Sequence, residues 1–409
     1  MTGSAPWRKN VFWLWFTQTL AIMGMSGVMP FIPIYIRDAF GIADETSRGF
    51  FVACFTFAGL FGLTASAPLW GMLGDRYGRK LMLLRAYLGL GLTIPLMLLA
   101  PNVWMLILIR LFSSFFAGTV TAAQALAVTC TPDDRHGLAL GTLSAAMWGG
   151  NMAGYFFGGI VVERIGYFWT FNGCGGLMML SALCSFAFIR EDFVPPQGGP
   201  VAKKRRFDAW RGLEPAIWVI CAIMFLIAVA RRTDGPYLAM LVEIVNGTTV
   251  RAAHDTGIVS GISSLGGILA GMVCGALCDR FSPRKVAVPL ILLAAAAGAA
   301  QATAAHIAVL SAARFLLFFA AGGLEPVFLA KLAHLTKPER RGTVFGLNAS
   351  LRNFGVLTAT LLSGGVICLV GTRGVFLIGA LLFPLVFPLM FLLARLESRG
   401  GAASSGGRR

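Results

Sequence analysis

The sequence contains a charged turn, Gly71-Met72-Leu73-Gly74-Asp75-Arg76-Tyr77-Gly78-Arg79-Lys80, which lies between two strongly apolar stretches. A second version follows as Gly275-Ala276-Leu277-Cys278-Asp279-Arg280-Phe281-Ser282-Pro283-Arg284-Lys285. Asp75 and Asp279 are 204 residues apart, which is about half of the 409-residue chain. The chain therefore consists of two repeats, each with a charged turn between apolar segments.

The composition indicates an integral membrane protein. Hydrophobic residues make up 57% of the chain and charged residues 13%, and the mean hydropathy is +0.76. An ordinary soluble domain carries about 25% charged residues. The apolar runs do not alternate with polar residues, so helices rather than barrel strands are expected to satisfy the backbone in lipid. We expect twelve spanning helices, which begin near Val11, Arg48, Leu81, Val103, Gly137, Tyr167, Pro215, Thr256, Val286, Ile307, Gly342 and Val375.

Basic residues are unevenly divided between the two membrane sides. If the N-terminus is cytoplasmic, 22 assigned lysines and arginines lie on the cytoplasmic side and five on the other: Arg37, Arg48, Arg164, Arg251 and Arg373. The positive-inside rule then places both termini in the cytoplasm of a multi-pass protein of the cell (inner) membrane. Because the basic residues are spread over loops at one face, nucleic-acid binding is not expected. Pro30 and Pro33 follow the first apolar segment in place of a cleavage site, so this segment is retained.

The fold class is therefore all-α integral membrane, with twelve transmembrane helices in two pseudo-symmetric six-helix halves. Residues 1–190 form the first half, 191–214 a cytoplasmic linker, 215–396 the second half and 397–409 a disordered tail. The linker contains the run Lys203-Lys204-Arg205-Arg206, which suits anionic lipid. Cys274 and Cys278 are one helical turn apart, but no His or carboxylate completes a metal site. No nucleotide-binding loop or nucleophile elbow appears, so we do not expect an enzyme. We expect the protein to be a monomer.

The repeated turn resembles the loop signature of the major facilitator superfamily, and the resemblance covers essentially the whole chain. It implies that the loop residues latch the two halves together on the cytoplasmic side. They are gate residues rather than substrate ligands. A simple basic loop would explain the lysines and arginines but not the glycines and aspartates. The gate residues are Gly71, Asp75, Arg76, Gly78, Arg79, Asp279 and Arg280.

The fifth helix carries a glycine pattern that resembles the antiporter signature of the drug:proton branch of that superfamily. The matching residues are Gly141, Gly150, Gly154, Gly158 and Gly159, whereas Tyr155 stands where the signature has proline. Small residues at these intervals form a smooth face for close helix packing. A generic packing face is the alternative to an antiporter motif.

Charged residues inside the predicted spans are the candidates for coupling and binding, because a charge in a span is costly. Arg110 resembles the helix-four arginine that the family associates with proton coupling, and Arg314 is its partner 204 residues later. Asp234 and Glu325 are the only acids that we place deep in a span, which makes them the candidate proton carriers. Arg231 and Asp234 are spaced to pair on one helix face. The substrate-cavity candidates are Arg231, Arg232, Arg314, Arg352, Gln124 and Gln18.

Two transport functions and one other function fit these residues. The resemblance favours export of amphipathic small molecules, driven by a proton gradient without any bound cofactor. Five intramembrane arginines against two acids favour instead the uptake or exchange of an organic anion. A membrane sensor that does not transport is the third hypothesis, and the repeated gate loops argue against it. In each case the partners are the lipid bilayer and a small molecule.

Overall fold

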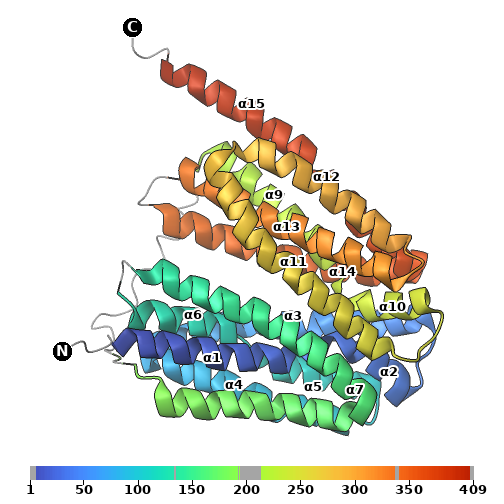
Figure 1. Cartoon of the computed structure of the whole chain (residues 1–409). Helices are drawn as coiled ribbons and strands as arrows, with labels where there is room; N and C mark the ends of the chain where they lie inside the picture. The colour runs from blue at the N-terminus through green and yellow to red at the C-terminus, as the bar shows by residue number, and fades with distance from the viewer. Residues whose placement is uncertain (1–5, 133–134, 192, 194–212, 337–339, 406–409) are drawn as a thin grey trace. The chain divides into compact units, whose positions relative to one another are not determined.

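A computed structural model describes residues 6–132, 135–191, 193, 213–336 and 340–405, and every regular element in these ranges is a helix (Figure 1). The chain divides into two compact units. Unit 1 comprises Met1–Gln197 and Pro236–Leu265, and unit 2 comprises Gly198–Gly235 and Gly266–Arg409. Thirty residues of the second repeat, Pro236–Leu265, therefore belong with the first repeat.

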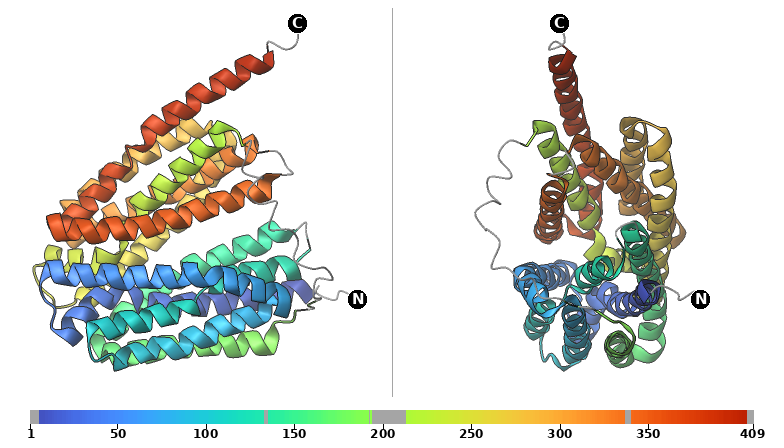
Figure 2. Two further views of the ribbon diagram at one scale, coloured as in Figure 1. Left: turned by 180° about the vertical axis from the view of Figure 1, so that it is seen from behind. Right: turned by 90° about the vertical axis from the view of Figure 1, so that its left-hand side faces the viewer.

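Unit 1 is a bundle of helices that the right-hand view of Figure 2 shows nearly end-on. Its elements are α1 (Pro6–Ser26), η1 (Met29–Phe31), α2 (Ile32–Phe40), α3 (Glu45–Tyr77), α4 (Arg79–Leu96), η2 (Met97–Leu99), α5 (Val103–Phe115), α6 (Thr119–Cys130), α7 (His136–Phe188), α10 (Leu238–Asn246) and the first half of α11 (Ala252–Arg280). Helix α7 packs on α1 and α4, and α3 packs on α5.

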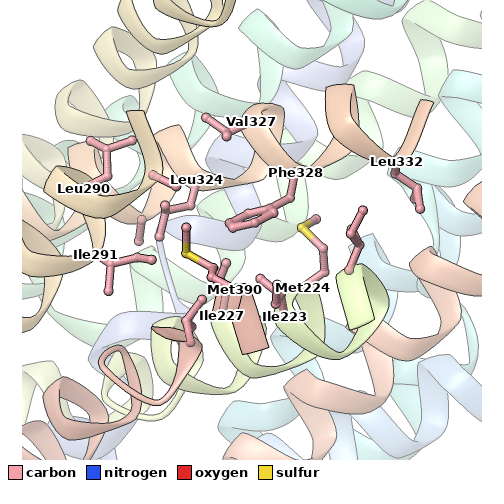
Figure 3. Close-up of a cluster of buried hydrophobic side chains, with 14 of the residues drawn as sticks. Ile223, Met224, Ile227, Leu290, Ile291, Leu324, Val327, Phe328, Leu332 and Met390 are labelled. Atoms are coloured by element: carbon pink, nitrogen blue, oxygen red, sulfur yellow. The ribbon is translucent and has the colours of Figure 1, made fainter. Parts of the chain in front are cut away.

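Unit 2 contains α9 (Pro215–Arg232), the second half of α11, α12 (Pro283–Ala302), α13 (Ile307–Leu335), α14 (Arg341–Leu382) and α15 (Val386–Ser405). The 3-10 turn η4 (Gly235–Tyr237) lies at the boundary between the units. Figure 3 shows the core of unit 2, where side chains of α9, α12, α13 and α15 point toward one another. Ile223, Leu290, Leu324 and Phe328 are among them.

Twelve membrane crossings follow from the helix lengths. Among the described residues, ten segments are long and apolar enough to span a membrane, and two of them, His136–Phe188 and Val344–Leu396, have 53 residues each. A straight helix of that length would extend about 80 Å, far more than a bilayer. Gly166 and Gly371 break these segments with φ angles of 84° and 69°, which only glycine adopts without strain. Each long segment therefore crosses twice, which confirms the predicted twelve-helix architecture.

The repeat is visible in the way the first and seventh spans are built. In both spans a proline interrupts the helix at a 3-10 turn, and a nine-residue helix follows, α2 or α10. Both short helices end at a left-handed glycine, Gly41 or Gly247. The two copies of the sequence thus fold into the same broken span.

The C-terminal boundary differs from the prediction. Helix α15 continues to Ser405, so its last turns lie within the segment from Glu397 that was expected to be disordered. Most of the predicted linker, residues 194–212, lies outside the described residues.

Candidate functional site

Asp234 and Arg314 form a deeply buried ion pair in unit 2. Arg314, on α13, donates from Nη1 to Asp234 Oδ2 at 2.5 Å and to Gln301 Oε1 of α12 at 3.0 Å. The Asp234 and Arg314 side chains are only 5% and 3% exposed. Asp234 Oδ1 is buried and has no hydrogen-bond partner among the described residues. One carboxylate oxygen is therefore fixed by an arginine while the other is free to hold a proton.

A second charged cluster of unit 2 is more exposed. Glu325 Oε1 pairs with Arg352 of α14, and Glu325 Oε2 lies 3.7 Å from Arg231 Nη1 of α9. The Glu325 and Arg352 side chains are 32% and 40% exposed. Charges that are exposed inside a membrane-spanning segment face water rather than lipid. This part of unit 2 is therefore a wet polar surface.

Phe318 lies beside both clusters. The guanidinium carbons of Arg231 and Arg314 lie 5.5 Å and 4.9 Å from its ring centroid. The sequence suggested that Arg231 pairs with Asp234. In the structure Asp234 pairs instead with Arg314, and Arg231 pairs with Glu325. Arg232 is exposed. The structure brings Asp234, Arg314, Arg231, Glu325 and Arg352 into one region of unit 2.

Arg110 lies in unit 1, on α5, and its environment is unusual for an arginine. Its Nε is buried without a hydrogen-bond partner, and its guanidinium lies 5.3 Å from the Phe55 ring centroid. A Cβ on Gly59 would lie 2.7 Å from this Nε, so glycine makes room for the side chain. Within the described part of the chain no carboxylate forms an ion pair with Arg110, so a structural ion pair, the alternative to a role in coupling, is not found there.

The two glutamines differ in their access to solvent. Gln18 on α1 is 1% exposed and accepts a hydrogen bond from the Tyr87 hydroxyl at 3.0 Å. It is a packed core residue of unit 1 rather than a cavity residue in this conformation. Gln124 on α6 is partly exposed.

The first gate loop connects α3 to α4, and Gly78 makes its turn with a φ angle of 97°. At Gly71 a Cβ would meet nothing within 4 Å, so no close contact with another described helix requires a glycine there. Arg76 is exposed over Tyr77, and Arg280 is exposed at the end of α11. The side chains of Asp75 and Asp279 lie outside the described residues, and their latch role stays a prediction.

Glu191 holds the first gate loop and was missed in the sequence. Its Oε1 and Oε2 accept the backbone N–H groups of Arg79 and Lys80, each at 2.8 Å. A carboxylate at this place satisfies free donors at the start of α4 and complements its dipole. No signal in a single sequence marks a cap that lies 111 residues away.

Four of the five motif glycines lie where α7 approaches another helix. A Cβ would lie 2.8 Å from the Thr19 carbonyl oxygen at Gly150 and 2.6 Å from the Gly27 oxygen at Gly158, both on the α1 side. Gly154 also faces α1. Gly159 instead faces α11, where a Cβ would lie 2.7 Å from the Ala253 oxygen. Gly141 is open to space, so it has no packing role among the described residues.

Glu243 is the most important residue that the sequence analysis missed. It lies on α10, within the span Pro215–Asn246, and it is buried between Arg37 and Arg48. Glu243 lies near the end of this span, so it is a third buried acid of the spans beside Asp234 and Glu325, which were predicted as the acids deep in them. Arg37 and Glu243 are 206 residues apart, so the repeat itself was the signal that would have aligned them.

These features define a multi-pass membrane transporter with an internal repeat and buried charges in its spans. The profile of the Major Facilitator Superfamily matches residues 14–253 and 220–409, and the chain belongs to this superfamily. It is therefore a secondary transporter and not an enzyme.

Multidrug resistance proteins and a solved transporter structure match almost the whole chain. The chain is 31% identical to the multidrug resistance protein MdtG of Rahnella sp. (strain Y9602), over 92% of this chain and 91% of the relative. It is 30% identical to MdtG of Proteus mirabilis (strain HI4320), over 90% and 92%. The fold is also similar to the nucleoside transporter NupG, with a TM-score of 0.78 and 13% identity over 95% of this chain and 99% of that one.

Proposed function

We propose that the protein exports amphipathic small molecules in exchange for protons. The observation that carries this proposal is Asp234, which is buried beside Arg314 and has one oxygen without a partner among the described residues. Such a carboxylate takes up a proton at Oδ1 without losing its hydrogen bond at Oδ2. The relatives' name, multidrug resistance protein, supports export of varied small molecules.

The proposal divides the work between two acids. Asp234 is the buried proton carrier, and the wet cluster of Glu325, Arg231 and Arg352 contacts the substrate. Glu325 is the second candidate carrier, because protonation would release its two arginines. Arg110, buried without a carboxylate partner in the described residues, keeps a role in coupling by its resemblance to the family's helix-four arginine.

The excess of basic residues on one set of loops supports a defined orientation. The proposal places both termini in the cytoplasm and the protein in the inner membrane, where it works as a monomer. The proton gradient across that membrane is then its only energy source, and no bound cofactor takes part.

Transport by purified protein in proteoliposomes tests the proposal. With an acidic interior, a gradient of about one pH unit supplies about 1.4 kcal/mol per proton, enough for roughly tenfold accumulation in one-to-one exchange. We expect uptake of a fluorescent amphipathic cation such as ethidium, and its loss in Asp234→Asn. Glu214→Gln is the matched control, since Glu214 is exposed at the start of α9. The proposal fails if no probe accumulates, or if Asp234→Asn and Glu325→Gln both behave as the unmodified protein does.

An organic anion is the second candidate substrate, because the clusters of unit 2 contain three arginines (Arg231, Arg314, Arg352) and two acids. Protonation of an acid there leaves more positive charge for an anion, so anion and proton would bind together. Uptake of an anion together with protons would then need a pH gradient with an alkaline interior, opposite to the gradient that drives exchange.

The direction of the gradient separates the two candidates. An alkaline interior would drive uptake of carboxyfluorescein if anions are carried with protons, and Arg352→Gln would weaken that uptake. Arg8→Gln, an exposed change on α1, serves as the control. Ethidium uptake with an acidic interior and no carboxyfluorescein uptake in either direction would exclude the anion candidate.

A further inference from the structure

Glu243 joins the two repeats through two ion pairs in unit 1. Its Oε1 pairs with Arg37 Nη1 of α2, and its Oε2 lies 2.7 Å from Arg48 Nη1 in the first turn of α3. The Glu243 and Arg48 side chains are 8% and 6% exposed. Both arginines belong to the first repeat and Glu243 belongs to the second, so the Glu243 carboxylate connects the two repeats.

The position of this cluster follows from the repeat. Arg37 and Glu243 are equivalent residues, one on α2 and one on α10, the nine-residue helices that end the first and seventh spans. Helices α2 and α10 contact each other, and they lie at the end of unit 1 away from the N-terminus (Figure 1). Where equivalent helices of a repeat meet, identical charges would repel. This chain has opposite charges there.

The cluster is closed and electrically neutral. Arg37 Nε also donates to Asp38 Oδ1 at 2.7 Å, and the Tyr167 hydroxyl donates to Asp38 Oδ2 at 2.8 Å. Two arginines thus face two carboxylates, and no charge remains for a substrate. In this respect the cluster differs from the clusters of unit 2, where arginines are in excess.

The charged cluster has two different neighbours: a buried apolar contact between the repeats, and a cavity. Phe31 and Ile34 of the first repeat share a buried apolar cluster with Ala239 and Ala252 of the second. Arg37 and Asp38 line a cavity of about 230 Å³. Water therefore reaches the rim of the cluster, while Glu243 and Arg48 lie behind it.

We propose that Glu243 is a positioning residue of the transport cycle, which holds the two repeats together at the end of unit 1 away from the N-terminus. Alternating access requires the repeats to separate at each end in turn. Both ion pairs of Glu243 must then break whenever this end opens and form again when it closes. The role is independent of the substrate and of the coupling ion.

Cysteine labelling tests the role directly. Ala239 is fully buried on α10, so Ala239→Cys in a background without native cysteines reports opening at this end. We expect a membrane-impermeant maleimide to label this cysteine roughly tenfold faster when Glu243→Gln is added, within the usual range for coupling between conformations. Asp38→Asn is the matched control. It removes a carboxylate from the same cluster, but its partners Arg37 and Tyr167 both lie in the first repeat.

A double variant separates positioning from simple stability. Glu243→Gln alone leaves Arg48 without its partner carboxylate, and Arg48→Gln/Glu243→Gln removes that charge as well. We expect the double variant to regain thermal stability but to keep the fast labelling, because the link between the repeats is still absent. Labelling at the unmodified rate in the double variant, or equal acceleration by Asp38→Asn, would overturn the proposal.

Discussion

At the residue scale, burial decides what each ion pair of unit 2 contributes. Asp234 and Arg314 are almost fully buried, whereas Glu325 and Arg352 are about one-third exposed or more. Removing one partner of a buried pair leaves an uncompensated charge and costs about 3–5 kcal/mol, while an exposed pair contributes about 0–1 kcal/mol. The two pairs therefore differ in kind: the first holds the fold, and the second is free to exchange partners.

Arg314→Gln should lower the free energy of unfolding by about 3–5 kcal/mol because it strands Asp234. Arg352→Gln should lower it by about 1 kcal/mol at most. Denaturant unfolding in detergent measures both, and Arg314→Gln/Asp234→Asn should recover part of the loss. Equal effects of the two single changes would show that burial does not set the energies.

Asp44 offers a pH test outside the spans. It precedes α3 and accepts the backbone N–H of Ser47 at 2.8 Å, and this bond holds the pKa of the Asp44 carboxyl below its ordinary value. Because the folded pKa is lowered, the stabilisation is present above the ordinary carboxyl pKa and is lost as the pH falls through the folded value. Asp44→Ala should therefore lower the Tm at neutral pH, and Asp44→Asn much less since asparagine also caps. The Asp44→Ala difference should shrink in acid; a constant difference at every pH would contradict the role.

At the element scale, the glycines of α7 determine how closely it approaches its neighbours. Gly158→Val should destabilise the protein by about 1–3 kcal/mol, because the added side chain overlaps the backbone of Gly27, directly after α1. Gly141→Val tests the same substitution on the same helix in open space. Thermal unfolding should show a large loss for the first and little change for the second. A similar loss at both positions would mean that helix propensity, not packing, is responsible.

At the scale of the whole molecule, hydropathy and the repeat predicted the fold, because each membrane span is a long apolar run that can be recognised on its own. The same reasoning found Asp234, Arg314, Glu325 and Arg352, since charges are rare in spans. It did not predict which of these residues form ion pairs with each other, because pairing depends on how the helices pack. Glu243 escaped because it lies near the end of a broken span, and the break at Pro236 could not be placed from hydropathy alone.

Over the whole transport cycle, coupling to the proton gradient is separable from the movement of the repeats. If the proton on Asp234 couples transport to the gradient, a neutral residue there removes the coupling but not the movement of the repeats. Asp234→Asn should still exchange labelled for unlabelled substrate across a proteoliposome membrane, at a rate within about tenfold of the unmodified protein and independent of pH. It should not concentrate substrate. Gly158→Val, which disturbs the scaffold, should slow exchange and accumulation together. Loss of exchange in a stable Asp234→Asn protein would assign Asp234 to substrate binding or to the scaffold, with Glu325 left as the proton carrier.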